Sequence, residues 1–300
     1  MAKILVTGGA GHVGSHIVEQ LQRKKKNHVV SLDNYFNGSV KNHIQGATYI
    51  KGDTKDIENL IPHDIDMIYH LGEYARIAPS INEPERVIEM NIVGTTSVLE
   101  YCRKYGSKLV YAASSTKFAS DGKERNANIY SYTKAANVDL INNYGKWYNI
   151  PYAICYFYNA YGPRENGVGK YATLIAKFEQ IYLSGGVFTI DKPGTQKRNF
   201  THVSDLARGM IMVGEKGYGD GYALGHRKSH SILEIAKAFG GEIVYTDNYS
   251  GRLKSGKSPN KAREELGWET TVDVIDYIEE FKRKNPINVL FNKSTKNQNE

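Results

Sequence analysis

A glycine-rich turn near the start of the chain constrains its fold more than any other feature. The turn T-G-G-A-G-H-V-G spans residues 7–14, after the apolar segment K-I-L-V-T (3–7) and before a segment with helical apolar spacing. In such a unit Gly8 allows the tight turn, Gly11 lets a pyrophosphate approach, and Gly14 lets the helix pack on the sheet. The helix N-terminus then offers free N–H groups to phosphate. A tight turn without a ligand is the alternative, but this context favours a dinucleotide site.

Strands and helices alternate through the first half of the chain. Short apolar segments predict strands at 3–7, 28–33, 48–53, 66–71, 108–114 and 151–157, and longer segments predict helices at about 84–105 and 130–146. Alternation of this kind favours a parallel sheet covered on both faces. We therefore expect an α/β fold with a Rossmann-type doubly wound parallel sheet.

The second half has a less regular pattern. It predicts a helix and a strand within 166–190, and a strand leading to a helix over 200–210 with Ser204 as N-cap. A further helix is expected from His230 or Ser231 to the glycines at 240 and 241, and a short one at 261–268. We expect a dinucleotide-binding domain at 1–165 plus about 198–230. A smaller, interleaved α/β domain would occupy about 166–197 and 231–285, followed by a polar tail at 286–300.

Composition excludes several classes of protein. Of 300 residues, 40% are hydrophobic and 24% charged, which is enough for a sizeable core. The net charge of +7 is spread along the chain, so nucleic-acid binding is not expected. No apolar run approaches the ~20 residues of a membrane span, and the N-terminus does not resemble a signal peptide. Cys102 and Cys155 are interpreted as buried free thiols of a cytoplasmic protein, and no cluster has metal-ligand spacing.

Two acidic residues follow the second and third predicted strands. Asp33 ends the second strand, 19 residues after Gly14. A carboxylate there can accept hydrogen bonds from both adenosine ribose hydroxyls and would repel a 2′-phosphate, which favours NAD over NADP. Asp53 ends the third strand, where the adenine amino group would lie. A loop or N-cap role remains the alternative for Asp33.

The segment Y-S-Y-T-K (130–134) at the start of a predicted helix suggests the chemistry. Tyr130 and Lys134 are four residues apart and face the same side of the helix. An ammonium near a phenol favours the phenolate, which can take a proton from a sugar hydroxyl while hydride leaves the same carbon. Ser114 ends the fifth strand at the ligand-binding edge and can hydrogen-bond the reacting oxygen. With 22 tyrosines in the chain, a packed aromatic is the alternative for Tyr130.

Several motifs in order resemble the extended short-chain dehydrogenase/reductase family. Besides the glycine turn and Y-S-Y-T-K, they are L-D-N-Y-F-N-G-S (32–39), Y-H-L-G-E-Y-A-R (69–76), N-I-V-G-T (91–95), V-Y-A-A-S-S-T (110–116), Y-F-Y-N-A-Y-G-P-R (156–164) and R-N-F-T-H-V-S-D (198–205). The resemblance covers almost the whole chain, to about Trp268. It is strongest to the nucleotide-sugar epimerases and dehydratases, with a pattern most similar to UDP-glucose 4-epimerases. It implies NAD as cofactor and a nucleotide-sugar site in the smaller domain.

The resemblance also implies roles for individual residues. The implied catalytic residues are Tyr130, Lys134 and Ser114. The cofactor would contact Gly8, Gly11, His12, Val13, Gly14, Asp33, Asn34, Asn37, Gly38, Asp53, Thr54, Leu71, Gly72, Asn91, Tyr130, Lys134 and Tyr156. The substrate would contact Arg76, Ser114, Ser115, Tyr130, Asn159 and Arg198, with Arg252 as a second phosphate ligand. Asp205 would have a structural role.

Departures from the family pattern narrow the reaction. Dehydratases carry an Asp–Glu pair where this chain has Ser115 and Thr116, and neither hydroxyl is a general acid near neutral pH. This disfavours elimination and favours a 4-epimerase that oxidises C4 transiently. A net dehydratase or oxidoreductase, and a catalytically silent NAD-binding sensor, remain as alternatives. The resemblance further implies a homodimer through the helices at 84–105 and 130–146. The sugar and nucleobase stay open.

Overall fold

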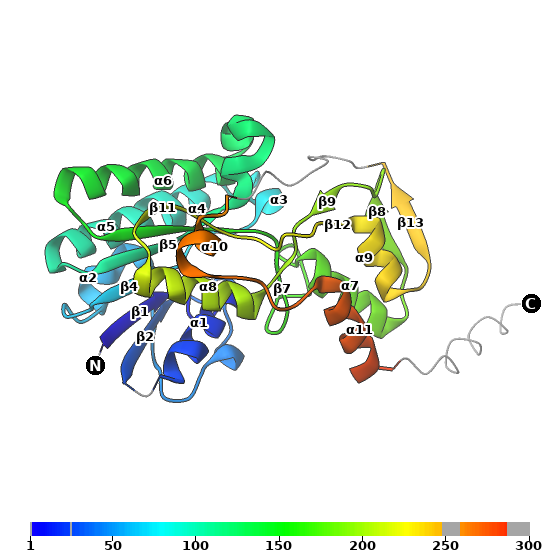
Figure 1. Cartoon of the computed structure of the whole chain (residues 1–300), viewed down its shortest axis with the longest axis horizontal. Coiled ribbons are helices and arrows are strands. Elements are labelled where there is room, and N and C mark those ends of the chain that lie inside the picture. The colour runs from blue at the N-terminus through cyan, green and yellow to red at the C-terminus, as the bar shows by residue number, and fades with distance from the viewer. Residues whose placement is uncertain (1, 25, 248–258, 287–300) are drawn as a thin grey trace, which may run out of the picture.

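A computed structural model describes residues 2–24, 26–247 and 259–286. Its main element is a seven-stranded sheet in the order β11-β6-β5-β4-β1-β2-β3, and all its pairings are parallel (Figure 1). The strands are β1 (Ala2–Thr7), β2 (Asn27–Asp33), β3 (Thr48–Lys51), β4 (Met67–His70), β5 (Lys108–Ser114), β6 (Tyr152–Phe157) and β11 (Gly219–Leu224). The strand order reverses between β1 and β4, which opens a crevice at their carboxyl ends. The predicted Rossmann-type fold is confirmed.

The edge strand β11 has no counterpart among the predicted strands. Its sequence G-D-G-Y-A-L begins with residues that are depleted in strands. The pairing with β6 is irregular between Gly219 and Tyr222. Only its second half, which is buried, has the apolar character of a sheet strand.

Four long helices cover the two faces of the sheet. α1 (His12–Gln22) and α8 (Val203–Lys216) lie together on one face, and α5 (Gly94–Tyr105) and α6 (Ile129–Tyr148) lie on the other (Figure 1). Because side chains alternate along a strand, β1 feeds both cores. Leu5 packs under α5 and α6, whereas Val6 packs under α1 and α8. Burial on both faces explains why the strands are continuous apolar runs.

The helix expected over 84–105 is a continuous helical run with an irregular middle. It comprises α4 (Pro84–Val87), a π-helical segment η3 (Ile88–Val93) and α5. Such wide turns re-aim side chains, often near functional sites. The remaining short helical elements of the large part are η1 (Val40–Asn42), η2 (Thr54–Asp56), α2 (Ile57–Leu60), α3 (Ile77–Ser80) and η4 (Ser115–Asn126).

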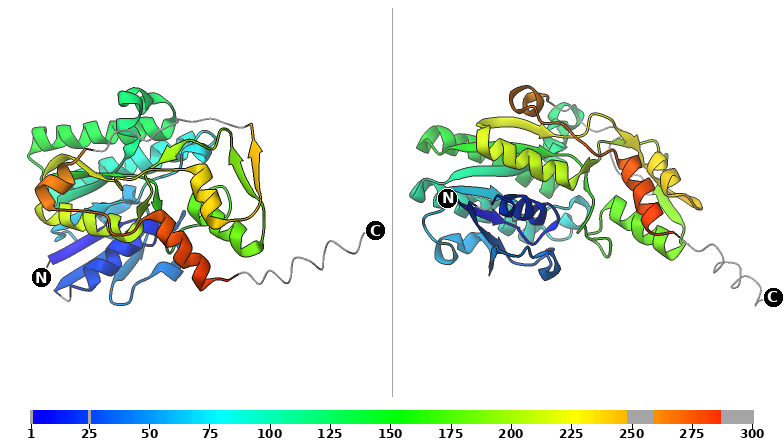
Figure 2. Two further views of the ribbon diagram at one scale, coloured as in Figure 1. Left: turned by 45° about the vertical axis from the view of Figure 1, so that its right-hand side comes forward. Right: turned by 60° about the horizontal axis from the view of Figure 1, so that its bottom comes forward.

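A smaller α/β part lies at one end of the large sheet, as all three ribbon views show (Figures 1 and 2). It contains α7 (Leu174–Ser184), β8 (Phe188–Asp191), α9 (Ile232–Phe239), β13 (Ile243–Thr246) and α11 (Val274–Lys284), with β8 and β13 paired in parallel. A third apolar cluster, including Phe178, Phe239 and Ile278, forms its core. Two short strand pairs lie in the segments that connect the two parts. They are β7 (Ala160–Tyr161) with β10 (Thr201–His202), and β9 (Lys197–Arg198) with β12 (His230–Ser231).

The chain returns to the large sheet before its last helix. α10 (Lys261–Leu266) packs against β11 and α8, and Trp268 is fully buried among Leu206, Met210 and Leu224. In Figure 1, α10 lies against the large sheet, while α11 lies in the smaller part. The chain thus passes from the large sheet into the smaller part, back to the large sheet at α10, and into the smaller part again at α11.

Helix ends follow the predicted chemistry at three of four places. Ser231 caps α9 in a capping box with Glu234, Gly240 ends that helix, and Gly267 ends α10 in the left-handed region at φ 65°. The prediction of Ser204 as N-cap of α8 is wrong. His202 precedes the helix, and its Nδ1 accepts from the backbone N–H of Ser204, which is already helical.

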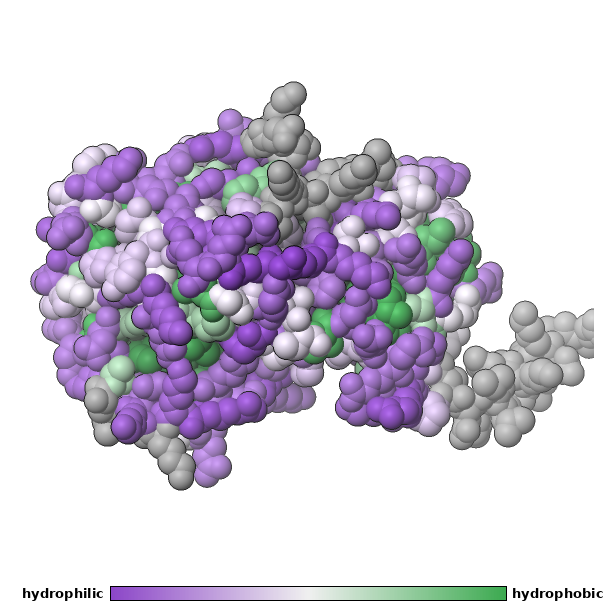
Figure 3. Space-filling model, viewed as in Figure 1, coloured by the Kyte–Doolittle hydropathy of each residue, from purple (hydrophilic) through white to green (hydrophobic). Residues whose placement is uncertain are grey.

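The two cysteines are buried, and the surface has no large apolar area on the face drawn in Figure 3. Cys102 and Cys155 are buried free thiols, as predicted. The face drawn in Figure 3 is mainly hydrophilic, with separate small apolar areas. No helix within residues 2–24, 26–247 and 259–286 is both long and apolar enough to cross a membrane.

Candidate active site

The glycine turn closes tightly over the first strand. Gly8 has φ 72° and its N–H donates to Leu32 O at 2.8 Å. A Cβ on Gly14 would lie 2.1 Å from Gly8 O, so a side chain there would break the turn. A Cβ on Gly38 would lie 2.9 Å from Asp33 Oδ1. These bare backbone positions leave the room that a dinucleotide needs beside the start of α1, so the residues present fit the cofactor.

A cavity of about 480 Å³ lies at the carboxyl ends of the central strands and collects most of the predicted site residues. Its walls come from the glycine turn, the ends of β2, β4 and β5, the start of α6 and the segment after β6. The predicted residues that line it are Gly8, Gly11, His12, Val13, Gly14, Asp33, Asn34, Asn37, Gly38, Asp53, Thr54, Leu71, Gly72, Arg76, Ser114, Ser115, Tyr130, Lys134 and Asn159.

Asp33 is held rigidly at the end of β2. Its carboxylate accepts from the N–H groups of Ala10 at 2.9 Å and Tyr35 at 2.8 Å. Burial raises the pKa of Asp33, and these two donors offset part of that effect. Asp53 accepts from Asn34 Nδ2 at 2.6 Å. Both carboxylates are thus fixed at the cavity wall.

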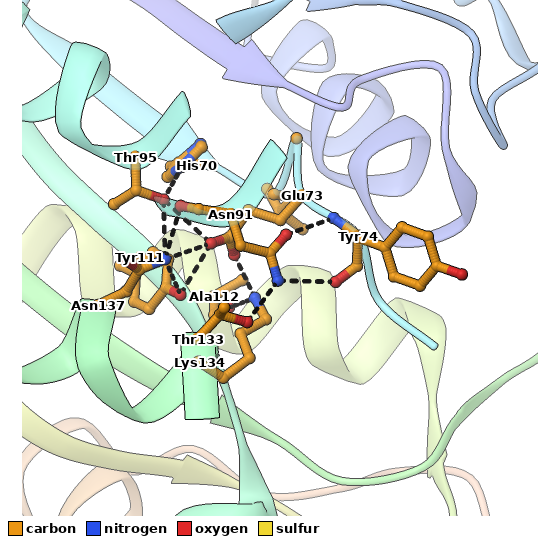
Figure 4. A network of polar contacts seen from close by, with 12 residues as sticks. His70, Glu73, Tyr74, Asn91, Thr95, Tyr111, Ala112, Thr133, Lys134 and Asn137 are labelled. Carbon is orange, nitrogen blue, oxygen red and sulfur yellow. Dashed lines mark hydrogen bonds and ion pairs between the residues drawn. The ribbon is translucent and has the colours of Figure 1, made fainter. Parts of the chain in front are cut away.

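Three predicted site residues do not line this cavity. Asn91 is fully buried and bonds to both backbone polar groups of Tyr74 and to Thr133, so it braces the site from behind (Figure 4). Tyr156 lies within β6, and its hydroxyl donates to Asp220 at 2.5 Å, so it faces away from the cavity that Phe157 lines. Arg198 is in β9 and does not line this cavity. Arg252 falls outside the described residues.

The Tyr130–Lys134 pair begins α6, as predicted, but its electrostatic setting is different from the expected one. Asn128 caps the helix by accepting from Ser131 N at 2.9 Å. The Lys134 ammonium forms an ion pair with Glu73 and donates to Ala112 O at 2.8 Å (Figure 4). Tyr130 and Lys134 both line the cavity. Lys134 therefore does not confront Tyr130 as an isolated positive charge.

Glu73 is a site residue that sequence reasoning missed. Its side chain is 0% exposed and accepts hydrogen bonds from Thr95 Oγ1 at 3.0 Å, Tyr111 hydroxyl at 3.0 Å and Asn137 Nδ2 at 2.8 Å (Figure 4). A buried carboxylate needs such donors and a counter-charge. The sequence signal was an acidic residue three positions after the last residue of the buried strand β4.

A second missed residue, Glu165, lies in the cavity wall near His12 and Arg76. Its side chain is 2% exposed, and neither carboxyl oxygen makes a hydrogen bond of normal geometry to the described residues. Burial raises the pKa of Glu165 to about 8, and Thr173 and Arg76 lower it only in part. Burial also holds the pKa of His12 well below its usual value. Glu165 therefore favours the protonated form near neutral pH, at a buried position in the cavity wall.

The positions after β5 carry hydroxyls only. Ser114, Ser115 and Thr116 all line the cavity, and Ser114 Oγ accepts from Thr116 N at 3.3 Å. No carboxylate occupies 115 or 116, so the arrangement can orient and ionise a hydroxyl through Ser114 and Tyr130. It lacks the acid–base pair that dehydratases resembling this chain carry at positions 115 and 116.

Comparisons with known proteins agree with this geometry. The family model of the NAD dependent epimerase/dehydratase family matches residues 4–225. UDP-glucuronic acid decarboxylase 6 of Arabidopsis thaliana is 29% identical over 293 residues, covering 90% of this chain and 84% of the relative. A putative UDP-glucose 4-epimerase of Methanocaldococcus jannaschii is also 29% identical over 293 residues, covering 92% and 95%.

A solved structure shares the fold as well. UDP-glucose 4-epimerase of Thermotoga maritima, solved with UDP-glucose, superposes with a TM-score of 0.85 at 27% identity, covering 94% of this chain and 99% of that one. The match of the family model to most of the chain identifies the cofactor as NAD and the protein class as an enzyme of nucleotide sugars. The chain therefore belongs to the NAD-dependent epimerase/dehydratase family.

Proposed function

We propose that the protein is a 4-epimerase of a nucleotide sugar, with a UDP-hexose as substrate. The observation that carries this proposal is the joint presence of Tyr130, Lys134 and Ser114 at one cavity whose positions 115 and 116 hold hydroxyls instead of an acid–base pair. Epimerases among the relatives and solved structures support it.

In this proposal the protein's residues move one proton and hold one oxygen. Tyr130 as phenolate removes the proton of the C4 hydroxyl, and Ser114 donates a hydrogen bond to that oxygen. NAD supplies a hydride acceptor that gives the hydride back at the end of the cycle. The 4-keto sugar turns about its phosphate linkage, and Tyr130 returns the proton after the other face is reduced. Lys134 contacts the cofactor ribose, and Asn159 contacts the diphosphate.

The experiment incubates the purified protein with UDP-glucose, UDP-galactose, UDP-GlcNAc and GDP-hexoses, and follows C4 inversion by NMR. Tyr130→Phe is expected to lower kcat by at least about 100-fold, the usual contribution of a positioned acid–base group. Tyr132→Phe is the matched control, because Tyr132 is 49% exposed on the same helix. If no hexose is inverted while a net dehydration or net cofactor reduction appears, the proposal is wrong. If Tyr130→Phe retains every function that can be measured for the wild type, a non-catalytic NAD-binding sensor would be favoured.

A decarboxylase is the second candidate, because similar relatives include UDP-glucuronic acid decarboxylases. UDP-glucuronic acid therefore belongs in the substrate panel. Release of carbon dioxide with formation of a UDP-pentose would replace the epimerase proposal. Inversion without loss of carbon would support it.

We further propose a cytoplasmic homodimer formed through α5 and α6. Val93 precedes α5, and Tyr132, Trp147 and Tyr148 on α6 are large apolar residues that are 45–61% exposed. Burying such residues in a two-fold helix contact would stabilise a dimer. Light scattering that gives a monomer mass would contradict this.

A further inference from the structure

The loop that leads into α7 connects two walls of the cavity. We call residues 165–173 the strap, and both of its end residues line the cavity. Near one end, Asn166 Nδ2 donates to Asn37 Oδ1 at 3.0 Å, and Asn37 lies on the loop after β2. Near the other end, Arg76 Nε, on the loop after β4, donates to Tyr171 O at 2.8 Å. Asn37 and Arg76 also line the cavity, so the strap is fastened to both walls.

Three aromatic rings close the space between these two walls. Phe36, which follows β2, and Tyr74, which follows β4, have ring centroids 5.4 Å apart. The Tyr74 ring points away from the buried network around Glu73 (Figure 4). The Tyr171 ring packs on both, at 5.1 Å from Phe36 and 6.1 Å from Tyr74. Aromatic pairs at such distances contribute more than their buried area alone, so the strap strengthens a bridge between the two loops.

This bridge lies on the path of the cofactor. In the sheet, β1 lies between β2 and β4, and the glycine turn follows β1. Asp33, the predicted adenosine ligand, ends β2, whereas Tyr130 is at the start of α6. A dinucleotide that joins these two places runs along the carboxyl ends of β2, β1 and β4. The rings span the same loops, and Phe36 lines the cavity between them.

A single carboxylate fastens the strap to the large part. Glu83 precedes α4, its side chain is 13% exposed, and both of its carboxyl oxygens lie 2.9 Å from the Tyr171 hydroxyl. Lys170 of the strap forms an ion pair with the same carboxylate. Arg86 Nη1 lies 3.1 Å from it, and the Arg86 guanidinium lies over the Phe36 ring. Hydrogen bonds to charged groups are stronger than neutral ones, so Glu83 is well placed to keep the strap closed.

We propose that the strap gates the exchange of NAD, with the contact between Tyr171 and Glu83 as its latch. Every one of these contacts joins protein groups to protein groups, so the strap must open both for binding and for release. Weakening the latch should therefore speed both steps and leave the affinity nearly unchanged. Loss of a direct contact to NAD would instead raise mainly the release rate.

The test follows NADH by stopped flow, because its fluorescence differs between the bound and the free state. Protein loaded with NADH is mixed with excess NAD to measure release, and cofactor-free protein is mixed with NADH to measure binding. Tyr171→Phe removes the hydroxyl and keeps the ring. We expect it to raise both rates about tenfold, the effect of losing one hydrogen bond to a charged group, and to change the dissociation constant by less than about twofold.

Glu83→Gln keeps the shape of the side chain and removes its charge. It should raise both rates by a similar factor, and the double variant with Tyr171→Phe should match the faster single variant within about twofold, because both changes weaken one contact. Tyr245→Phe is the control for Tyr171→Phe, since Tyr245 is 43% exposed on β13 and does not line the cavity. Glu89→Gln is the control for Glu83→Gln, since Glu89 forms an exposed ion pair with Lys55.

Two results would overturn the proposal. One is that Tyr171→Phe and Glu83→Gln exchange NADH at the rates of their controls. The other is faster release with an unchanged binding rate, because the strap would then act as a cofactor contact and not as a gate. If Glu83→Gln does not fold, Lys170→Met takes its place, since that side chain is 62% exposed. No sugar is needed, so a failed epimerase assay leaves this inference standing, and unchanged exchange rates leave the proposed function standing.

Discussion

Asp205 is a buried residue outside the cavity whose substitution should cost considerable stability. It lies at the start of α8, and its side chain is 2% exposed. Its carboxylate accepts from Arg208 Nη2 at 2.8 Å and from the backbone N–H and hydroxyl of Thr271 at 2.7 and 2.8 Å. The N–H of Val272 lies at 3.3 Å. This single side chain fastens the segment after α10 to α8, the structural role expected for it.

Asp205→Asn tests the strength of that link. The amide keeps the shape but loses the charge, and its NH₂ group faces donors. Hydrogen bonds to charged groups contribute about 1.5–3 kcal/mol each, and part is recovered by rearrangement, so we expect a loss of about 2–4 kcal/mol in the free energy of unfolding. Such a loss lowers the melting temperature of a chain of this size by roughly 5–15 °C.

Circular dichroism melts and urea titrations at neutral pH would measure this change, with NAD absent from all samples. Asp276→Asn is the matched control, because Asp276 is exposed on α11, and it should cost less than about 1 kcal/mol. If Asp205→Asn costs no more than the control, the segment after α10 is not held by this carboxylate and the reasoning fails.

Three further predictions concern the turn, the cavity and a helix cap. Gly14→Ala should weaken NAD binding at least about tenfold and destabilise the fold by about 1–3 kcal/mol, because the added Cβ would meet Gly8 O. Calorimetry would measure the NAD affinity, and a urea titration would measure the free energy of unfolding. An unchanged NAD affinity would contradict the prediction. Glu165 has a pKa raised to about 8 in the fold, so the native state retains a proton that the unfolded chain has lost, and stability falls as pH rises from about 4.5 to 8. Over that pH range the free energy of unfolding of Glu165→Gln should therefore fall by roughly 2–4 kcal/mol less than that of the wild type, as measured by urea titrations. Unfolding free energies of the two proteins that change in parallel with pH would contradict the raised pKa. Ser231→Ala should cost about 1 kcal/mol in the same measurement through loss of the capping box with Glu234, whereas a neutral result would show that α9 is held by packing alone.

The fold was predictable because local patterns determine it. The glycine turn, the apolar strands and the caps of α9 and α10 act over a few residues, and each was visible in the sequence. β11 was not, because its glycines hide a strand that forms through tertiary contacts, by pairing with β6 and packing against α8 and α10. The N-cap of α8 was misassigned by two residues because histidine is not a typical cap.

The site was predictable where family motifs reach into the cavity. Its long-range electrostatics were not. Glu73 meets Lys134 across 61 positions of sequence, and nothing in either segment reveals this distance or the burial of both side chains. Glu165 likewise becomes a proton-carrying group only because the fold buries it. Tyr156 does not line the cavity, because neighbouring residues of a strand point to opposite faces and Phe157 takes the side that faces the cavity.

The return of the chain to the large sheet at α10 affects how this molecule can be recombined with its relatives. Trp268 completes the apolar core beneath α8, although it is separated from α8 in the sequence by α9 and β13 of the smaller part. A chimera that exchanged everything after residue 225 would carry a foreign tryptophan segment into the host core. The transferable unit instead consists of three segments, 166–197, 226–259 and 274–284, and leaves residues 261–272 of the host in place. The smaller part can then be exchanged without disturbing the packing beneath α8.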